Sequence, residues 1–272
     1  MKLGIYLKNM GPQATRAHLL AAARDSEAAG IDELWVVDHL AIPPDDAEGS
    51  EGWYLDPLAT LAFLAGATER IRLGVGVLVL PYRPPLPTAK WVATIQELAG
   101  ERLALGVGAG WMPAEFKALG VDRSRRGRTT DQTLEFLHEC FASDEVQVNE
   151  QPFLFRPRPA RPPFIVGGSP PHATRRCVRY GDGWMPFVGD PAKVAEPIAE
   201  LQREMEAAGR APAEIVGIVA IDPENPDKSA AKLQAARDVG VTSAVLAWRY
   251  KDDTDFRRGL ETITEQLRPR LG

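Results

Sequence analysis

One apolar run of this chain stops abruptly at two ionisable residues, Asp38 and His39. The preceding residues, ELWVV at 33–37, are rich in β-branched and aromatic side chains, which predicts a buried strand that delivers both residues at its C-terminal tip. Histidine gains and loses a proton near neutral pH, so His39 is the best acid or base candidate among the four histidines. The alternative is a histidine that only ends the strand and bonds to the backbone.

A second group of candidates, Gly167, Gly168 and Ser169, precedes a predicted helix that begins near residue 171. Free backbone N–H groups, a hydroxyl and a helix N-terminus together make a seat for a phosphate group. Arg175 and Arg176, one turn further, can add positive charge. A tight turn between strand and helix is the alternative interpretation.

Gly76 is unusual because it lies inside an apolar stretch, RLGVGVLV at 72–79, that otherwise predicts a strand. Glycine weakens a strand unless a bulge or a close approach to the backbone requires it. We therefore expect either a flat group lying against the backbone near Gly76 or a packing neighbour that leaves no room for a side chain.

Several other chemistries lack their sequence patterns. Residues 167–171, GGSPP, depart from the G-x-S-x-G nucleophile elbow because proline replaces the last glycine. The chain has no H-E-x-x-H and no histidines or carboxylates at ligand spacing, so no metal is expected. Cys140 and Cys177 have neither C-x-x-C nor metal spacing and are expected to be reduced core thiols.

Charge and hydropathy restrict the partners. The net charge of -5 comes without a basic stripe, so nucleic acid is not expected as a partner. No apolar run approaches the roughly 20 residues that span a bilayer, so no membrane partner is expected. The first seven residues are too short for a signal peptide and predict a first strand, which favours a cytoplasmic protein.

Alternating strand and helix patterns predict the scaffold that positions the candidates. The predicted strands lie at 3–7, 33–37, 72–79, 102–107, 163–166, 183–187, 214–221 and 243–248. The predicted helices lie at about 14–29, 56–68, 85–99, 124–142, 171–180, 190–208, 228–238 and 255–268. This alternation, with near-continuous apolar strands, predicts a closed (β/α)8 TIM barrel that forms a single domain over residues 1–272. The strand C-termini of such a barrel surround one mouth, where the candidate residues would converge.

The main rival architecture is a doubly wound open sheet. It requires a glycine-rich phosphate loop directly after the first strand, where this chain has KNMGP at 8–12. The barrel is therefore favoured. The longest irregular region, 111–163, is expected to hold one helix and a small hairpin at 146–149 and 153–155.

Five ordered motifs together resemble the bacterial luciferase-like superfamily, and most closely its coenzyme F420-dependent oxidoreductases of a short-chain subgroup. The motifs are VDHL at 37–40, RLGVGVLVLP at 72–81, GERLALGVGAGW at 100–111 with EF at 115–116, PFIVGGS at 163–169 and GDGWMP at 181–186. The resemblance covers nearly the whole chain and implies a (β/α)8 barrel that binds a deazaflavin or flavin at the mouth.

The resemblance also implies roles for the candidate residues. It implies a bulge with a cis peptide bond between Gly76 and Val77, against which the cofactor ring stacks. It implies that Asp38 hydrogen-bonds the cofactor and that His39 holds or protonates the group that receives hydride. The remaining cofactor contacts that it implies are Gly108, Ala109, Gly110 and Trp111 beside the polyhydroxy chain, and Gly167, Gly168 and Ser169 at the phosphate.

One position departs from the pattern. Sugar-phosphate dehydrogenases of this superfamily carry a glutamate acid directly after the glycine segment, where this chain has Trp111. Glu115, four residues on, either reaches the mouth or forms a helix-opening salt bridge. His39 is then the candidate for the only proton-transfer group of the site.

The resemblance favours an F420-dependent oxidoreductase that transfers hydride between a reduced deazaflavin and a small organic substrate. A reduced-FMN-dependent monooxygenase of the same fold is the alternative, and a non-catalytic flavin- or deazaflavin-binding barrel is a further one. The resemblance also suggests a homodimer. An aromatic-walled mouth for an apolar, planar substrate is suggested by Asn9, Tyr82, Trp111, Trp184, Trp248 and Tyr250. Ordinary packing of these residues is the alternative.

Overall fold

Eight parallel strands close into a barrel in the computed structural model, which describes residues 1–271. The barrel strands are β1 (Lys2–Tyr6), β2 (Glu33–Val36), β3 (Arg72–Val79), β4 (Leu103–Gly108), β7 (Phe164–Gly167), β8 (Gly183–Met185), β9 (Glu214–Ala220) and β10 (Ser243–Ala247). Neighbours in the chain are neighbours in the barrel, and β10 pairs with β1 to close it. The predicted (β/α)8 barrel is confirmed.

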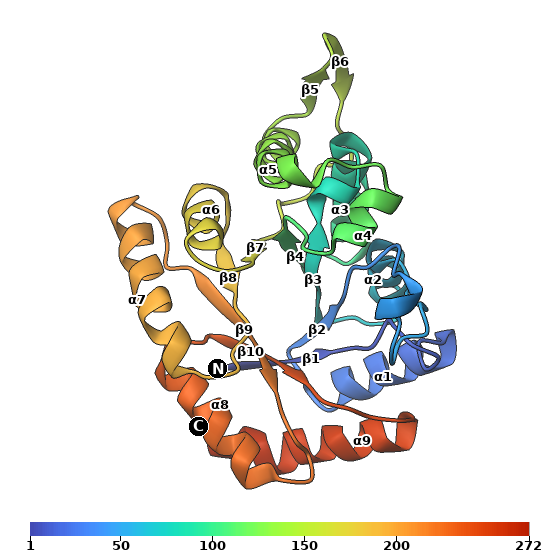
Figure 1. The fold of residues 1–272 in the computed structure, drawn as a ribbon, viewed down its shortest axis with the longest axis vertical. Coiled ribbons are helices and arrows are strands. Elements are labelled where there is room, and N and C mark those ends of the chain that lie inside the picture. The colour runs from blue at the N-terminus through green and yellow to red at the C-terminus, as the bar shows by residue number, and fades with distance from the viewer. Residues whose placement is uncertain (272) are drawn as a thin grey trace.

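Helices surround the barrel on its outside (Figure 1). They are α1 (Arg16–Ala28), α2 (Pro57–Ala65), α3 (Pro85–Leu98), α4 (Pro113–Ala118), α5 (Arg126–Ala142), α6 (His172–Tyr180), α7 (Ala192–Ala207), α8 (Pro226–Asp238) and α9 (Asp253–Glu261). Their starts follow local chemistry: the Asp56 side chain accepts a hydrogen bond from Ala59 N, and Pro57 occupies the first turn of α2. Among the described residues, no helix is long and apolar enough to cross a membrane.

The irregular region between β4 and β7 contains more structure than the sequence pattern predicted. The expected hairpin is confirmed as β5 (Glu145–Val148) and β6 (Gln151–Leu154), which projects away from the barrel (Figure 1). The prediction of a single helix there was wrong, because the short α4 precedes α5. Six residues behind a proline are too few for a helical hydrophobic period to be recognised.

The barrel interior is filled by side chains, as in other barrels of this kind. One buried cluster inside the barrel consists of Trp35, Ala104, Ile165, Met185, Val216 and Val245. Partly buried Tyr6, Val77 and Ile218 pack against this cluster. Two of these, Tyr6 and Val77, also line the pocket at the mouth, so the interior layer supplies part of the pocket floor.

The two glycines inside β3 leave room for different neighbouring side chains. A Cβ atom at Gly74 would overlap the ring of Trp35, so this glycine serves barrel packing. At Gly76 a Cβ atom would lie 2.8 Å from Met185 Sδ and 3.2 Å from the Tyr6 hydroxyl oxygen, and that hydroxyl donates a hydrogen bond to the Gly76 carbonyl. The β3 register shifts at this point, and the Gly76–Val77 peptide bond is cis, as predicted.

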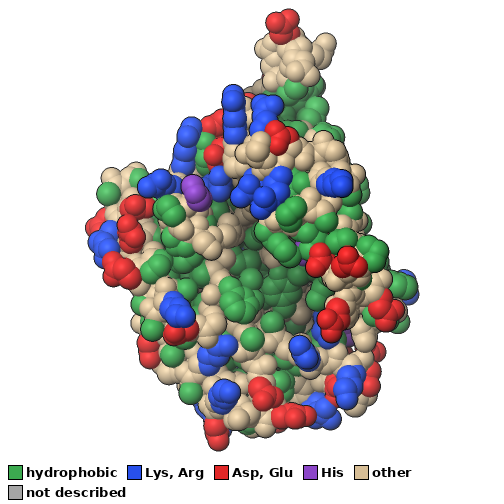
Figure 2. All heavy atoms as spheres, in the orientation of Figure 1, with side chains coloured by type: hydrophobic (Ala, Val, Ile, Leu, Met, Phe, Trp, Pro, Cys, Tyr) green, Lys and Arg blue, Asp and Glu red, His purple; other side chains and the backbone are tan. Residues whose placement is uncertain are grey.

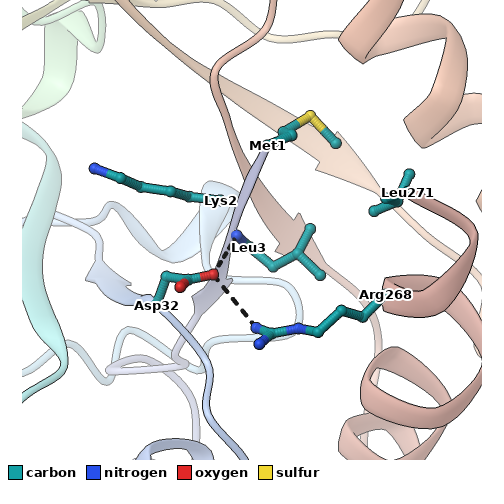
Figure 3. A pocket seen from close by; sticks show the side chains of 6 residues that line it. All are labelled: Met1, Lys2, Leu3, Asp32, Arg268 and Leu271. Atoms are coloured by element: carbon teal, nitrogen blue, oxygen red, sulfur yellow. Dashed lines mark hydrogen bonds and ion pairs between the residues drawn. The ribbon is translucent and has the colours of Figure 1, made fainter.

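The end of the barrel opposite the mouth has its own small cavity of about 360 Å³. It is lined by Met1, Lys2, Leu3, Asp32, Arg268 and Leu271 (Figure 3). Asp32 Oδ2 accepts a hydrogen bond from Leu3 N at 2.8 Å and lies 3.3 Å from Arg268 Nη2. These contacts tie the first strand to the C-terminal segment, so we assign this cavity a structural role.

Candidate active site

A pocket of about 620 Å³ opens at the mouth formed by the strand C-termini. Figure 2 shows a hollow in the centre of the drawn face, with hydrophobic side chains inside it and Lys, Arg and His side chains along its upper edge. Every residue for which the resemblance implies a catalytic or cofactor-binding role lines this pocket: Asp38, His39, Gly76, Val77, Gly108, Ala109, Gly110, Trp111, Gly167, Gly168 and Ser169. The structure therefore brings together residues that are up to 131 positions apart in the numbering, from 38 to 169.

His39 is held by a buried carboxylate. Its Nδ1 lies 2.9 Å from Glu115 Oε2, and the Glu115 side chain is 1% exposed. Glu115 Oε2 also accepts a hydrogen bond from the Tyr82 hydroxyl at 3.1 Å, and Oε1 accepts from the backbone N–H groups of Leu40 and Ala41. Burial alone would raise the pKa of Glu115, but the hydrogen bonds from His39, Leu40 and Ala41 outweigh it and lower the pKa to about 2.

Two aromatic rings flank His39 within the pocket region. The Trp111 ring meets the imidazole edge-on, with centroids 6.2 Å apart, and the Tyr54 ring does so at 5.1 Å. Trp111 itself is 66% exposed, so it forms part of the rim and leaves one face free for a ligand.

Asp38 is bonded to the protein through both carboxylate oxygens. Oδ2 accepts hydrogen bonds from Val79 N at 2.8 Å and Arg83 Nη1 at 2.6 Å, and Oδ1 accepts from Arg83 Nη2 at 2.8 Å. Burial raises the pKa of the Asp38 carboxyl, while Arg83 and the Val79 N–H favour its ionised form. Asp38 lines the pocket but acts first as the anchor of the β3 end, and its predicted hydrogen bond to a cofactor stays a prediction.

The glycines of β4 and β7 make room for Val77. A Cβ atom at Gly108 would lie 2.5 Å from Val77 Cγ2, and one at Gly167 would lie 2.6 Å from Val77 Cγ1. Real Cβ atoms do not approach so closely, because the repulsion would displace the neighbour. These two glycines thus seat the Val77 side chain, a role that the sequence pattern alone did not indicate.

The far side of the pocket is polar and basic. Gly168 has a φ of +112°, which lets the chain turn from β7 into the first turn of α6 with the Ser169 hydroxyl at the pocket. The same side of the pocket is lined by His172 at the start of α6, and by Arg126 and Arg176. The sequence pattern had singled out Arg176 but not Arg126 as a contributor to this site.

Four residues expected at the mouth do not line the pocket. Asn9 is fully buried, and its amide bonds to the backbone of Val37 and Leu55. Trp184, Trp248 and Tyr250 are buried in the main core cluster. Of the six residues named for an aromatic mouth, Tyr82 and Trp111 line the pocket, and ordinary packing accounts for the others.

The pocket residues fit a phosphate-bearing planar cofactor. The volume of the pocket lies in the range of known ligand and cofactor pockets, about 300–1,000 Å³. Gly76 and Gly110 line the pocket, and a Cβ atom at these positions would collide with Met185 and Val79, respectively, so bare backbone is kept there and can lie against a flat ring system. The Ser169 hydroxyl forms no hydrogen bond within residues 1–271, and Arg126 has no carboxylate partner there, so both can bind a phosphate. Among these residues, no group of three or more His, Cys, Asp or Glu side chains is placed to hold a metal ion.

A closed parallel barrel with this pocket at its mouth has the architecture of a luciferase-like TIM barrel. The sequence profile of the luciferase-like monooxygenase family matches residues 1–271, and the chain belongs to this family. Among solved structures, the fold is similar to that of the monooxygenase RslO1 from Streptomyces bottropensis, with a TM-score of 0.85, 19% identity and full coverage of both chains.

Two relatives with assigned activities are both redox enzymes. The F420-dependent hydroxymycolic acid dehydrogenase of Mycobacterium tuberculosis is 30% identical over 235 residues, which cover 79% of this chain and 61% of that protein. The 4-hydroxyprotoasukamycin monooxygenase of Streptomyces nodosus subsp. asukaensis is 30% identical over 207 residues, 70% of this chain and 53% of that protein. The family therefore contains both F420-dependent oxidoreductases and monooxygenases.

Proposed function

We propose that this protein is an F420-dependent oxidoreductase that transfers hydride between a reduced deazaflavin and a small organic substrate. The observation that carries the choice of F420 over FMN is Arg126, which lines the polar side of the pocket without a carboxylate partner among residues 1–271, together with exposed arginines, likewise unpaired there, close to it in the chain or on α6. The proposal is supported further by the similarity to the F420-dependent hydroxymycolic acid dehydrogenase.

Arg126 lines the pocket, and further arginines lie near it in the chain or on the first turn of α6. Those that are exposed and form no ion pair with a carboxylate of residues 1–271 are Arg123, Arg125, Arg128 and Arg175. In contrast, Arg176 is paired with Asp131. In a chain of net charge -5, such a local excess of cations favours a ligand with anionic groups beyond one phosphate. Coenzyme F420 carries carboxylates beyond its phosphate, whereas FMN ends at the phosphate.

Under this proposal, separate residues of the pocket bind the phosphate, support the ring and transfer the proton. Ser169, Arg126 and the N–H groups before α6 bind the phosphate, and the Gly76–Val77 backbone supports the ring. When bound and reduced, the deazaflavin supplies the hydride. His39 faces the same pocket and exchanges the proton that accompanies the hydride at the substrate.

Titration of the apoprotein with F420 and with FMN, followed by fluorescence, tests the proposal. We expect F420 to bind more tightly, and an Arg126→Gln, Arg175→Gln double variant to weaken F420 binding about tenfold or more with a smaller effect on FMN. Arg203→Gln is the matched control, because Arg203 is exposed on α7 and is paired with Glu196. Selective binding of FMN by the wild type would overturn the proposal.

A reduced-FMN-dependent monooxygenase is the second candidate. The observation that favours it is the identity of 30% with the 4-hydroxyprotoasukamycin monooxygenase. The same titration separates the two candidates. Consumption of dioxygen in step with product formation would support the monooxygenase, and turnover under strict anaerobiosis would support hydride transfer.

A further inference from the structure

The carboxylate of Glu115 determines which groups around it carry protons. A carboxylate accepts hydrogen bonds and donates none, so all four groups that face it must be donors. Leu40 and Ala41 donate through their backbone N–H groups. Burial and the neighbouring Glu115 charge both raise the pKa of Tyr82, so its hydroxyl stays protonated and donates as well. The fourth donor is His39 Nδ1.

This arrangement restricts the tautomer of His39. A neutral imidazole has one N–H, and the contact with Glu115 requires that it be on Nδ1. Nε2 has no hydrogen-bond partner within residues 1–271, and the His39 ring lines the pocket. Nε2 is therefore the nitrogen that can exchange a proton with a bound molecule.

We propose that Glu115 is a positioning residue that holds the proton of neutral His39 on Nδ1, so that Nε2 serves as the proton donor and acceptor of the reaction. This inference rests on the proposed function for its chemical context. In carbonyl reduction, the hydride that the bound cofactor would supply forms a new C–H bond at the carbonyl carbon as the donor C–H bond breaks, and the carbonyl π electrons move to oxygen. The oxygen then takes the proton from Nε2 of the imidazolium, which leaves neutral His39 protonated on Nδ1. Alcohol oxidation is the reverse.

The surroundings of the pair contain few other ionisable groups. Tyr82 faces Glu115 from the 3₁₀ turn Leu80–Tyr82, and Tyr54 lies against the imidazole from the loop before α2. Asp38 precedes His39 in the chain and is neutralised by Arg83. Glu115 is thus the carboxylate that contacts His39 and balances the charge of its imidazolium form.

The tautomer of His39 is measurable in the apoprotein by long-range ¹H–¹⁵N correlation spectra of ¹⁵N-labelled histidines. The chain has four histidines, so a His39→Gln variant suffices to assign the signal. In its neutral form, we expect wild-type His39 to carry its proton on Nδ1. His138 is an internal reference, because its Nε2 bonds to the Tyr180 carbonyl at 2.9 Å and is far from the substituted positions in the chain. Wild-type His39 with its proton on Nε2 would overturn the inference without any variant.

Two variants sharpen the test. In Glu115→Gln the amide oxygen can keep the Leu40 and Ala41 bonds, which turns the NH2 group toward Nδ1, and we expect the proton of His39 to move to Nε2. Tyr82→Phe removes a different partner of Glu115 and should leave the tautomer on Nδ1. An unchanged His39 signal in Glu115→Gln would refute the positioning role. The readout needs no cofactor, so a protein that binds FMN and not F420 would refute the proposed function and leave this result intact.

Discussion

Replacing Glu115 with glutamine is expected to lower the free energy of unfolding at neutral pH and to have little effect in strong acid. A pKa lowered from 4.5 to about 2 corresponds to about 3 kcal/mol of preferential stabilisation of the ionised side chain by the fold. Because the folded-state pKa is the lower one, this stabilisation is complete above the ordinary pKa and is lost as the pH falls toward 2. Glutamine keeps the size of the side chain and removes the charge.

Urea unfolding of the wild type and Glu115→Gln at several pH values between 7 and 3 measures this difference. The difference in unfolding free energy should be about 3 kcal/mol at pH 7 and should shrink steadily below pH 4.5. Glu196→Gln is the control, because Glu196 and Arg203 form an exposed pair whose loss is expected to cost less than about 1 kcal/mol. A difference at pH 7 no larger than that of the control, or one that does not change with pH, would refute the assignment of Glu115 as a buried, ionised partner of His39.

Three further substitutions test other parts of the site. Gly108→Ala would place a Cβ atom 2.5 Å from Val77 Cγ2, so we expect a loss of about 1–3 kcal/mol in urea unfolding and weaker cofactor binding. Asp38→Asn leaves the half-buried Arg83 without its bidentate partner and should destabilise the protein by about 3 kcal/mol in the same assay. Ser169→Ala should leave the fold unchanged and weaken cofactor binding about fivefold in a fluorescence titration, the value of one hydrogen bond.

Each of these has a clear contrary outcome. Wild-type stability of Gly108→Ala would mean that the Val77 side chain can repack without a clash with the new methyl group. Wild-type stability of Asp38→Asn would mean that Arg83 relies on Asp56, which lies 3.1 Å from its Nη2. Unchanged cofactor affinity in Ser169→Ala would mean that the arginines and the backbone N–H groups bind the phosphate without the Ser169 hydroxyl.

The barrel was predictable because its signals are local and repeated. Strands that are apolar on both faces, helices that end before glycine and a capping Asp56-Pro57 pair each depend on a few neighbouring residues. The in-strand Gly76 likewise marked the β3 bulge, although the same reasoning could not separate it from Gly74, whose neighbour Trp35 lies on the adjacent strand β2.

The contacts of Glu115 were not predictable in this way. Its partner His39 lies 76 positions away, and only the folded barrel brings them to 2.9 Å. The sequence left two interpretations of Glu115, a residue that reaches the mouth and a helix-opening salt bridge. Each is partly right, because Glu115 stands in the first turn of α4 and also lines the pocket at the mouth. Asn9 failed as a mouth residue for a similar reason, because its amide completes the backbone hydrogen bonds of Val37.

Trp111 stands where a proton-donating glutamate would otherwise be expected. Where resembling sugar-phosphate dehydrogenases place a glutamate acid, this chain has an exposed ring set edge-on to His39, while a carboxylate lies behind the imidazole at Glu115. A carboxyl group with a pKa of about 2 has no proton to give near neutral pH, so Glu115 cannot replace the missing acid. It can only orient His39 and balance its charge. Because Tyr82 is held as a donor to that same carboxylate, Nε2 of His39 is the proton-transfer atom that we propose for this side of the pocket.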